Sequence, residues 1–137
     1  MADRLEGRAK DILTEGKNYV HVSIPREDGT VQSVIVWGHT DDAGNVTLNS
    51  AEGRGWPANL RRAETATVTA MADNNPYEWV AVTGRLTEAT HDGADEHIDM
   101  LAKKYIDADS YPFRKEGEQR IKFTLAPERV HYNPPSS

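Results

Sequence analysis

Residues 49–62 of the chain read NSAEGRGWPANLRR, and the rest of the sequence is organised around them. The stretch leaves an alternating apolar run, passes two glycines and enters a short helix at Pro57. Glycine lets a backbone approach a ligand closely, and the free N–H groups at the start of a helix point toward anions. Proline suits the first helical turn, where a missing N–H costs no hydrogen bond. The stretch therefore predicts an anion site.

Three arginines supply the local basic charge of this stretch: Arg54, Arg61 and Arg62. A guanidinium group forms strong, charge-assisted hydrogen bonds with phosphate, which favours the anion site. The alternative is that Gly53 and Gly55 form an ordinary turn and that the arginines lie on a solvated helix face. The residues of the stretch leave both interpretations open.

The composition limits the class of protein. At 137 residues the chain has the length of one domain, and we expect a single domain over residues 1–137. A net charge of −6 argues against binding to nucleic acid or an anionic membrane, which requires a basic surface. The absence of cysteine excludes disulfides and thiolate sites. No apolar run approaches the ~20 residues of a membrane span, and the first ten residues are charged, so we expect a cytoplasmic protein.

The spacing of apolar residues predicts mainly strands. Residues 3–15 form an amphipathic helical pattern, in which Asp3 and Glu6 are spaced like a capping box. The period then changes to two, and Asp28-Gly29 is typical of a hairpin turn. The alternating pattern predicts a buried set on the first strand: Val20, Val22 and Ile24.

Further strands are predicted over residues 30–40, 46–50, 65–72, 77–90, 120–125 and 128–132. Both faces of the 30–40 strand are largely apolar, so we expect it to be covered on both sides. Gly84 indicates a bulge or a close backbone approach. Residues 94–106 have the period of a helix that lies on a sheet. Strands in hairpin order with appended helices predict an antiparallel barrel over about residues 18–132, and residues 133–137 are expected to fray.

No motif for side-chain catalysis is present. The five histidines are scattered without the spacing of metal ligands, so we expect no metal site. Nucleophile-elbow, phosphate-loop and dinucleotide fingerprints are absent from the sequence. If the protein is an enzyme, its difficult chemistry must come from a cofactor.

Several short motifs together resemble a known superfamily. They are the DG turn at 28–29, QSVIVW at 32–37, the 49–62 stretch, NPY at 75–77, VTGR at 82–85, ADEHI at 94–98, YPFR at 111–114 and PERV at 127–130. In this order they resemble the pyridoxamine-phosphate-oxidase-like split β-barrels. Within that superfamily they are similar to the flavin/deazaflavin oxidoreductases that use coenzyme F420.

The resemblance implies a homodimer with cofactor sites in grooves between the subunits. By this resemblance the deazaflavin ring is lined by Gln32, Ser33, Val34, Ile35 and Val36. The ribityl chain and the phosphate are held by Asn49, Ser50, Arg54 and Asn59. Other residues expected at the cofactor are Gly55, Trp56, Pro57, Ala58, Arg61, Arg62, Tyr77 and Trp79.

One departure from the superfamily pattern concerns the phosphate. Trp56 stands where many relatives have a lysine two residues after the arginine. The loss of that cation shifts phosphate binding to Arg54, to the backbone N–H groups of Ala58 and Asn59, and to Arg61 or Arg62. Trp56 itself packs on the cofactor, at the dimer interface or in the core.

The expected function is the transfer of hydride from reduced F420 to an unsaturated, apolar or quinone-like small molecule. Such a reaction needs donor and acceptor held in contact without water, and it needs no acid or base from the protein. FMN is the alternative cofactor, and a cofactor carrier without turnover is the alternative function. The anionic tail of F420 extends beyond the phosphate, so the arginines at 61 and 62 favour F420.

Overall fold

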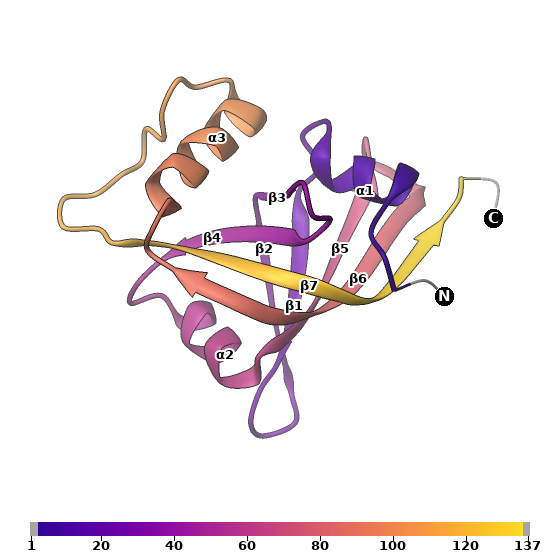
Figure 1. Ribbon diagram of the computed structural model, residues 1–137, viewed down its shortest axis with the longest axis horizontal. Helices are drawn as coiled ribbons and strands as arrows, with labels where there is room; N and C mark the ends of the chain where they lie inside the picture. Colours follow the sequence, from indigo (N-terminus) through magenta and orange to yellow (C-terminus); the bar gives the residue numbers. More distant parts are fainter. Residues whose placement is uncertain (1–2, 136–137) are drawn as a thin grey trace.

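A computed structural model describes residues 3–135 of the chain (Figure 1). Strands form one antiparallel seven-stranded sheet, and helices lie against its inner surface and its ends. Among the described residues, no helix is long and apolar enough to cross a bilayer. The elements are α1 (Gly7–Thr14), β1 (Val20–Pro25), β2 (Val31–Val36), β3 (Gly38–Thr40), β4 (Val46–Ala51), α2 (Gly55–Ala63), β5 (Thr65–Ala72), β6 (Asn75–Thr90), α3 (Ala94–Ile106) and β7 (Arg120–Asn133).

The sheet curls because its two edges are joined by one residue. The strand order is β2-β1-β5-β6-β7-β4-β3, so β2 and β3 lie at opposite edges. Val36 pairs with Val20 at one edge and Gly38 pairs with Leu48 at the other, and only Trp37 lies between them. A flat sheet of this width could not be spanned by one residue, which reaches about 3.5 Å. The result is the curled half-barrel of Figure 1.

The sequence predicted a single strand over residues 30–40, and this is wrong. The strand is broken at Trp37, because the chain leaves β1 there and joins β4. Gly38 permits the sharp change of partner, since a Cβ at this position would lie 2.7 Å from Val20 Cγ2. Hydrophobic pattern could not reveal the break, because apolar residues continue on both sides of it.

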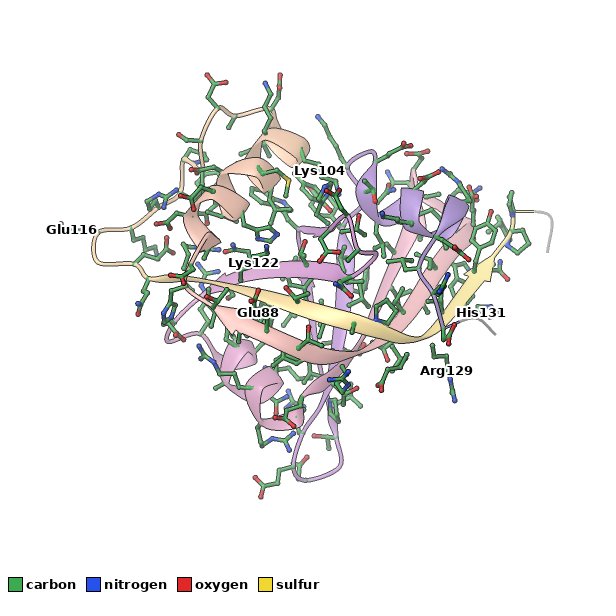
Figure 2. The ribbon with its side chains drawn as sticks, in the orientation of Figure 1. Glu88, Lys104, Glu116, Lys122, Arg129 and His131 are labelled. Atoms are coloured by element: carbon green, nitrogen blue, oxygen red, sulfur yellow. The ribbon has the colours of Figure 1, made fainter. Side chains whose placement is uncertain are left out.

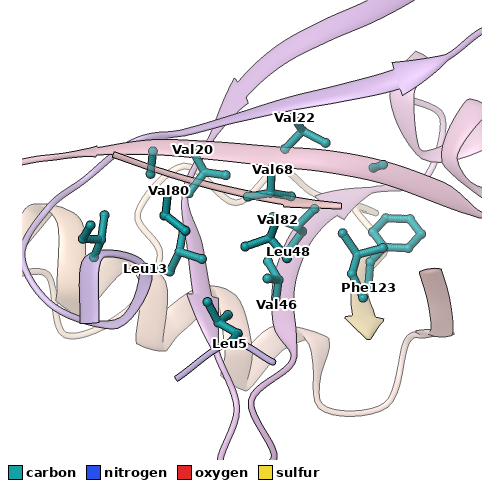
Figure 3. Close-up of a cluster of buried hydrophobic side chains, with 14 of the residues drawn as sticks. Leu5, Leu13, Val20, Val22, Val46, Leu48, Val68, Val80, Val82 and Phe123 are labelled. Carbon is teal, nitrogen blue, oxygen red and sulfur yellow. The ribbon is translucent and has the colours of Figure 1, made fainter. Parts of the chain in front are cut away.

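The core lies inside the curled sheet. The predicted buried set of β1 is confirmed, since Val20, Val22 and Ile24 are fully buried. Figure 3 shows side chains from β1, β4, β5, β6 and β7 meeting there, together with Leu5 and Leu13 from the α1 region. Burial of this apolar surface is the main stabilising contribution to the fold.

The outer face of β2 is exposed, which contradicts the expectation that this strand is covered on both sides. Val31 is 57% exposed and Ile35 is 64% exposed, whereas Val34 and Val36 pack against the core. The reason is that β2 is an edge strand and the helices of the same chain pack elsewhere. Apolar side chains therefore remain on an open sheet surface.

The expected irregularity at Gly84 is confirmed. The pairing of β6 with β7 shifts register between Thr83 and Gly84, and a Cβ on Gly84 would lie 3.0 Å from the Ala126 carbonyl oxygen. The sequence predicted two short strands over 120–125 and 128–132. In the structure β7 continues through Pro127 as one strand, because the shift in its register with β6 falls beside the proline. Asn133, expected in the frayed tail, is still paired, and residues 136–137 lie outside the described part.

Helices α1 and α2 begin at positions that differ from those expected. Helix α1 starts at Gly7, because the positive φ of Gly7 sets the preceding residues outside the helix. Its N-cap is Glu6 without a side-chain hydrogen bond, so the predicted capping box is wrong. Helix α2 starts at Gly55, two residues earlier than expected, and Pro57 falls in its first turn. Helix α3 spans the residues predicted for it.

We predict that Gly84→Ala lowers the free energy of unfolding by about 1–3 kcal/mol, because the added methyl meets backbone atoms of β7 that cannot move aside. The midpoint of urea unfolding measures this loss. Gly55→Ala is the matched control, since no atom lies within 3.8 Å of its added Cβ and the position is helical. A wild-type midpoint for Gly84→Ala would show that the close approach is absent.

Candidate functional site

Helix α2 lies beside strand β2. Asn59 Nδ2 donates a hydrogen bond to Gln32 Oε1 at 3.1 Å, which ties the helix to the edge strand. A cleft of about 420 Å³ opens at this junction, and we call it the polar cleft. Its lining residues are Arg26, Glu27, Asp28, Gln32, Gly55, Asn59 and Arg62. The cleft thus gathers four predicted cofactor residues and adds Arg26, which has no motif of its own in the sequence.

A second cleft, of about 290 Å³, lies between the β2 end of the sheet and α3, and we call it the aromatic cleft. Arg54 lines the aromatic cleft, and the next residue, Gly55, lines the polar cleft, so the two adjoin at the start of α2. The lining residues of the aromatic cleft are Tyr19, Ile35, Val36, Trp37, Asn49, Arg54, Ile98, Leu101, Tyr111, Phe113 and Arg120. We call these two adjoining clefts together the groove.

A buried hydrogen-bond network supports the floor of the aromatic cleft. Arg120 Nε donates to Asn49 Oδ1 at 2.9 Å. Asn49 Nδ2 then donates to the Ala94 carbonyl oxygen at 2.9 Å and contacts His97 Nδ1 at 3.0 Å. Asn49 is therefore held rigidly between β7 and α3, and the sequence analysis missed both Arg120 and His97.

The network fixes the protonation of His97. A guanidinium group only donates, so Asn49 must present its oxygen to Arg120 and its NH₂ to the imidazole. His97 Nδ1 is thus an acceptor, and the proton resides on Nε2, a buried atom without a partner among the described residues. Burial, with smaller contributions from the charges of Lys122, His39 and Arg120, lowers the pKa of His97 to about 3. The imidazole is neutral at pH 7.

One carboxylate separates the two arginines of the aromatic cleft. Glu118 Oε1 lies 3.1 Å from Arg120 NH1 and 3.6 Å from Arg54 NH2. Glu118 Oε2 is buried and has no hydrogen-bond partner among residues 3–135. Arg120 is almost fully buried, whereas the Arg54 side chain is half-exposed at the rim. The pair forms a cationic region that a single carboxylate only partly neutralises.

The start of α2 determines which backbone N–H groups are free. Because the helix begins at Gly55, the amides of Gly55 and Trp56 have no carbonyl partner within it. We expected free amides at Ala58 and Asn59, but both residues follow the first turn, so their amides bond to carbonyls four residues back. Asn59 still reaches the polar cleft through its side chain.

Trp56 and Pro57 point away from the groove. Trp56 is 7% exposed and its ring lies 5.5 Å from the ring of Phe123, so it belongs to the core. Among the three places that the sequence left open for this tryptophan, the structure favours the core. The side chain of Trp56 therefore lines neither cleft.

The two consecutive arginines of α2 have different surroundings. Arg61 makes a two-pronged ion pair with Glu52 at 2.8 Å for each contact. This pairing lowers the pKa of Glu52 to about 2, with a further contribution from His91. Arg62 instead contacts Asn59 Oδ1 and the Pro25 carbonyl oxygen, and it lines the polar cleft. Arg62 is thus available to a ligand in the polar cleft, and Arg61 is neutralised.

Four other predicted residues do not join the groove within one chain. Ser50 follows Asn49 on β4 and points to the opposite face, where its hydroxyl is buried without a partner among the described residues. Ser33 lies on the exposed outer face of β2. Tyr77 and Trp79 lie at the far end of β6, beside α1, where Trp79 contacts His131 at 5.1 Å between ring centroids.

The loop between α3 and β7 forms one wall of the aromatic cleft. Arg114 anchors it by ion pairs of 2.8 Å with Asp95 and Asp99 of α3. Figure 2 shows Glu116 at the outer tip of this loop, away from the sheet. Tyr111 and Phe113 face the cleft from the same loop. Both residues belong to the YPFR motif at 111–114, which by itself indicated no role for them.

Solved structures share this fold. An F420 reductase matches with a TM-score of 0.76 and 19% identity, over 92% of this chain and 98% of that one. A conserved hypothetical protein from Mycobacterium tuberculosis matches with a TM-score of 0.70 and 16% identity, over 98% and 89% of the two chains. A pyridoxamine 5'-phosphate oxidase assigned in Lactobacillus delbrueckii matches with a TM-score of 0.65 and 16% identity, over 95% of each chain.

No family profile matches the sequence, and no curated protein matches it. At these identities the likeness concerns the fold. The expected resemblance to split β-barrels of the pyridoxamine-phosphate-oxidase type is confirmed at that level. The more specific likeness, to the F420 reductase, spans nearly all of both chains.

We predict that buried His97 makes the fold sensitive to acid. Its pKa is about 3 in the folded state and near 6.5 in the unfolded chain, so the unfolded state binds more protons between these values. The contribution of His97 to the free energy of unfolding is therefore fully present above about pH 6.5, and it is lost as the pH falls below that value. Between pH 7 and pH 5, His97→Gln should lose about 1–2 kcal/mol less than wild type in urea unfolding. His21→Gln, an exposed control on β1, should behave as wild type, and equal losses for all three proteins would contradict the assignment.

Proposed function

We propose that the protein is an F420-dependent reductase that passes hydride to a small conjugated acceptor. The observation that carries this proposal is the pair of adjoining clefts beside β2: one holds two arginines and two carboxylates, and the other is lined by aromatic rings. The likeness to an F420 reductase supports it. FMN in the same groove is the alternative.

The residues present fit a phosphate-bearing flavin or deazaflavin. Arg62 and Arg26, together with the free amides at the start of α2, supply donors for a phosphate. The free edge of β2 presents backbone N–H and C=O groups, which complement the amide-like edge of a flavin ring. Gln32 of the polar cleft and Val36 of the aromatic cleft would line the ring from the inner side of β2.

The protein contributes orientation and exclusion of water. A reduced deazaflavin supplies a hydride and a proton, which together reduce one double bond of an acceptor. Neither a carboxylate nor an imidazole is among the described residues that line the aromatic cleft. The side chains of Trp37, Tyr111 and Ile98 hold an acceptor in van der Waals contact and keep the cleft dry, which supplies the proximity that the reaction needs.

Homodimer formation is part of the proposal. The outer face of β2, β1, β5 and β6 carries exposed Val31, Ile35, Met71 and Tyr77, and no helix of the same chain covers it within the described residues. An uncovered apolar sheet face of this kind favours association. A second copy on this face would bring its residues to the groove and would give Tyr77 and Trp79 a place at the cofactor.

Sedimentation equilibrium should give twice the 15.3 kDa chain mass, and a monomer at micromolar concentration would contradict the dimer.

The direct test of the function uses purified protein with F420 and, separately, FMN. We expect quenching of F420 fluorescence on binding, tighter affinity for F420 than for FMN, and steady oxidation of reduced F420 with a quinone acceptor. Tight binding of F420 without turnover would identify a carrier instead. Tighter binding of FMN would assign the alternative cofactor.

The two consecutive arginines of α2 provide a matched pair of variants. Arg62→Gln should weaken F420 binding about two- to ten-fold at low salt, because this guanidinium lines the polar cleft. Arg61→Gln should change it little, because Glu52 already pairs with that charge. The effect of Arg62→Gln should shrink at high salt, since exposed charges are screened over about 8 Å at physiological ionic strength. Equal losses of F420 affinity in both variants would contradict the distinction between Arg62, which lines the cleft, and Arg61, which Glu52 neutralises.

A further inference from the structure

A row of aromatic rings surrounds the aromatic cleft. Tyr19 stacks on Tyr105 at 5.7 Å, and Tyr105 stacks on Trp37 at 5.5 Å with an angle of 6° between the rings. Trp37 meets Tyr111 edge-on at 6.1 Å, and Tyr111 meets Phe113 in the same way at 5.7 Å. The rings come from the residue before β1, from the link between β2 and β3, from α3 and from the loop that follows it, and mutual packing limits their movement. The cleft therefore has a preformed wall suited to a flat ligand.

Arg120 enters this wall with a fixed orientation. Its Nε is bound to Asn49 Oδ1 at 2.9 Å, and its NH1 is bound to Glu118 Oε1 at 3.1 Å. The guanidinium carbon lies 5.0 Å from the centroid of the Tyr111 ring. The remaining nitrogen, NH2, has no hydrogen-bond partner among residues 3–135. One edge of a rigidly held guanidinium group thus remains available to a ligand.

The charge of the cleft points to the kind of ligand. Both charged residues of its lining, Arg54 and Arg120, are cations, in a chain whose net charge is −6. A neutral, apolar acceptor would cover the buried Arg120 without pairing its free N–H groups, which is costly. An anionic oxygen would form a charge-assisted bond with them. The volume of about 290 Å³ limits the ligand to a small ring system.

We infer that the aromatic cleft selects planar, conjugated acceptors that carry an anionic oxygen, either a carboxylate or an ionised hydroxyl group, and that Arg120 determines this specificity. The rings of Trp37 and Tyr111 contact the flat face of the acceptor, and Arg120 NH2 donates to its oxygen. This inference rests on the proposed function only in naming the ligand as the hydride acceptor. It narrows the apolar or quinone-like acceptor expected from the sequence to one that carries an anionic oxygen.

Glu118 modulates the same contact. Its Oε1 is shared between Arg120 and Arg54, so it competes with a ligand anion for both cations. Removal of this negative charge leaves the geometry of Arg120 supported by Asn49 and should strengthen anion binding. Glu118→Gln therefore tests the charge of the cleft without removal of the arginine, and it complements Arg120→Gln, which also loses the bond to Asn49.

The test measures binding without any cofactor, by isothermal calorimetry. The probes are 2-hydroxy-1,4-naphthoquinone, whose hydroxyl is ionised at neutral pH, and 1,4-naphthoquinone, which has the same rings without a charge. Wild type should bind the anionic probe about ten- to a hundred-fold more tightly, the range of a hydrogen bond to a charged group. Arg120→Gln should bind the two within about two-fold of each other, and Glu118→Gln should bind the anion more tightly than wild type does.

Arg114→Gln is the matched control, because Arg114 lies on the same loop but pairs with Asp95 and Asp99 outside the cleft. It should keep the preference of wild type. Equal affinity of wild type for both probes would overturn the inference, as would an unchanged preference in folded Arg120→Gln. If Arg120→Gln does not fold, unchanged or weaker anion binding by Glu118→Gln overturns it instead. Binding of the anion without oxidation of reduced F420 would refute the proposed function alone.

Discussion

The link through Trp37 is the constraint on which the rest of the structure depends. One residue joins the two edges of a seven-stranded sheet, so the sheet must curl until those edges meet. At this corner, helix α3 supplies hydrogen-bond partners for the backbone of Gly38. The Tyr105 hydroxyl accepts a hydrogen bond from Gly38 N at 3.1 Å, and Lys104 Nζ donates to Gly38 O at 2.8 Å. The corner thereby attaches α3 to the sheet.

The attachment of α3 also creates the candidate site. Lys104 donates in addition to the Leu13 carbonyl oxygen at 2.7 Å, so α1, β3 and α3 meet around one ammonium group, labelled in Figure 2. Burial lowers the pKa of Lys104 to about 8, a sign of how closely the elements pack. With α3 fixed in this way, Trp37 stacks on Tyr105 and forms one side of the aromatic cleft. The corner and the cleft are thus two consequences of the same packing.

Sequence reasoning succeeded where a local pattern determines the structure. The alternation at Val20, Val22 and Ile24 identified a buried strand face, and Gly84 identified a bulge. It failed at Trp37, because a change of strand partner leaves the apolar pattern intact. The motif at 49–62 predicted that α2 begins near the groove. The hydrogen bond between Asn59 of α2 and Gln32 of β2 agrees with this prediction.

The remaining site residues could not be found from sequence because tertiary contacts determine them. Arg61 and Arg62 are adjacent and chemically identical, and only the position of Glu52 makes one neutral and leaves the other in the cleft. Arg120 is far from Asn49 along the chain, yet the pairing of β4 with β7 places the two side chains in contact. Neither relation has a local signal.

The central claim is that a cofactor lies along the free edge of β2, between the polar and aromatic clefts. Hydrogen–deuterium exchange of the amides, measured by mass spectrometry with and without F420, tests it most directly. The account predicts slower exchange in residues 31–37 and 54–59 on addition of F420, with no change in residues 7–14 of α1. Protection that is absent from β2, or that appears equally in α1, would contradict the account.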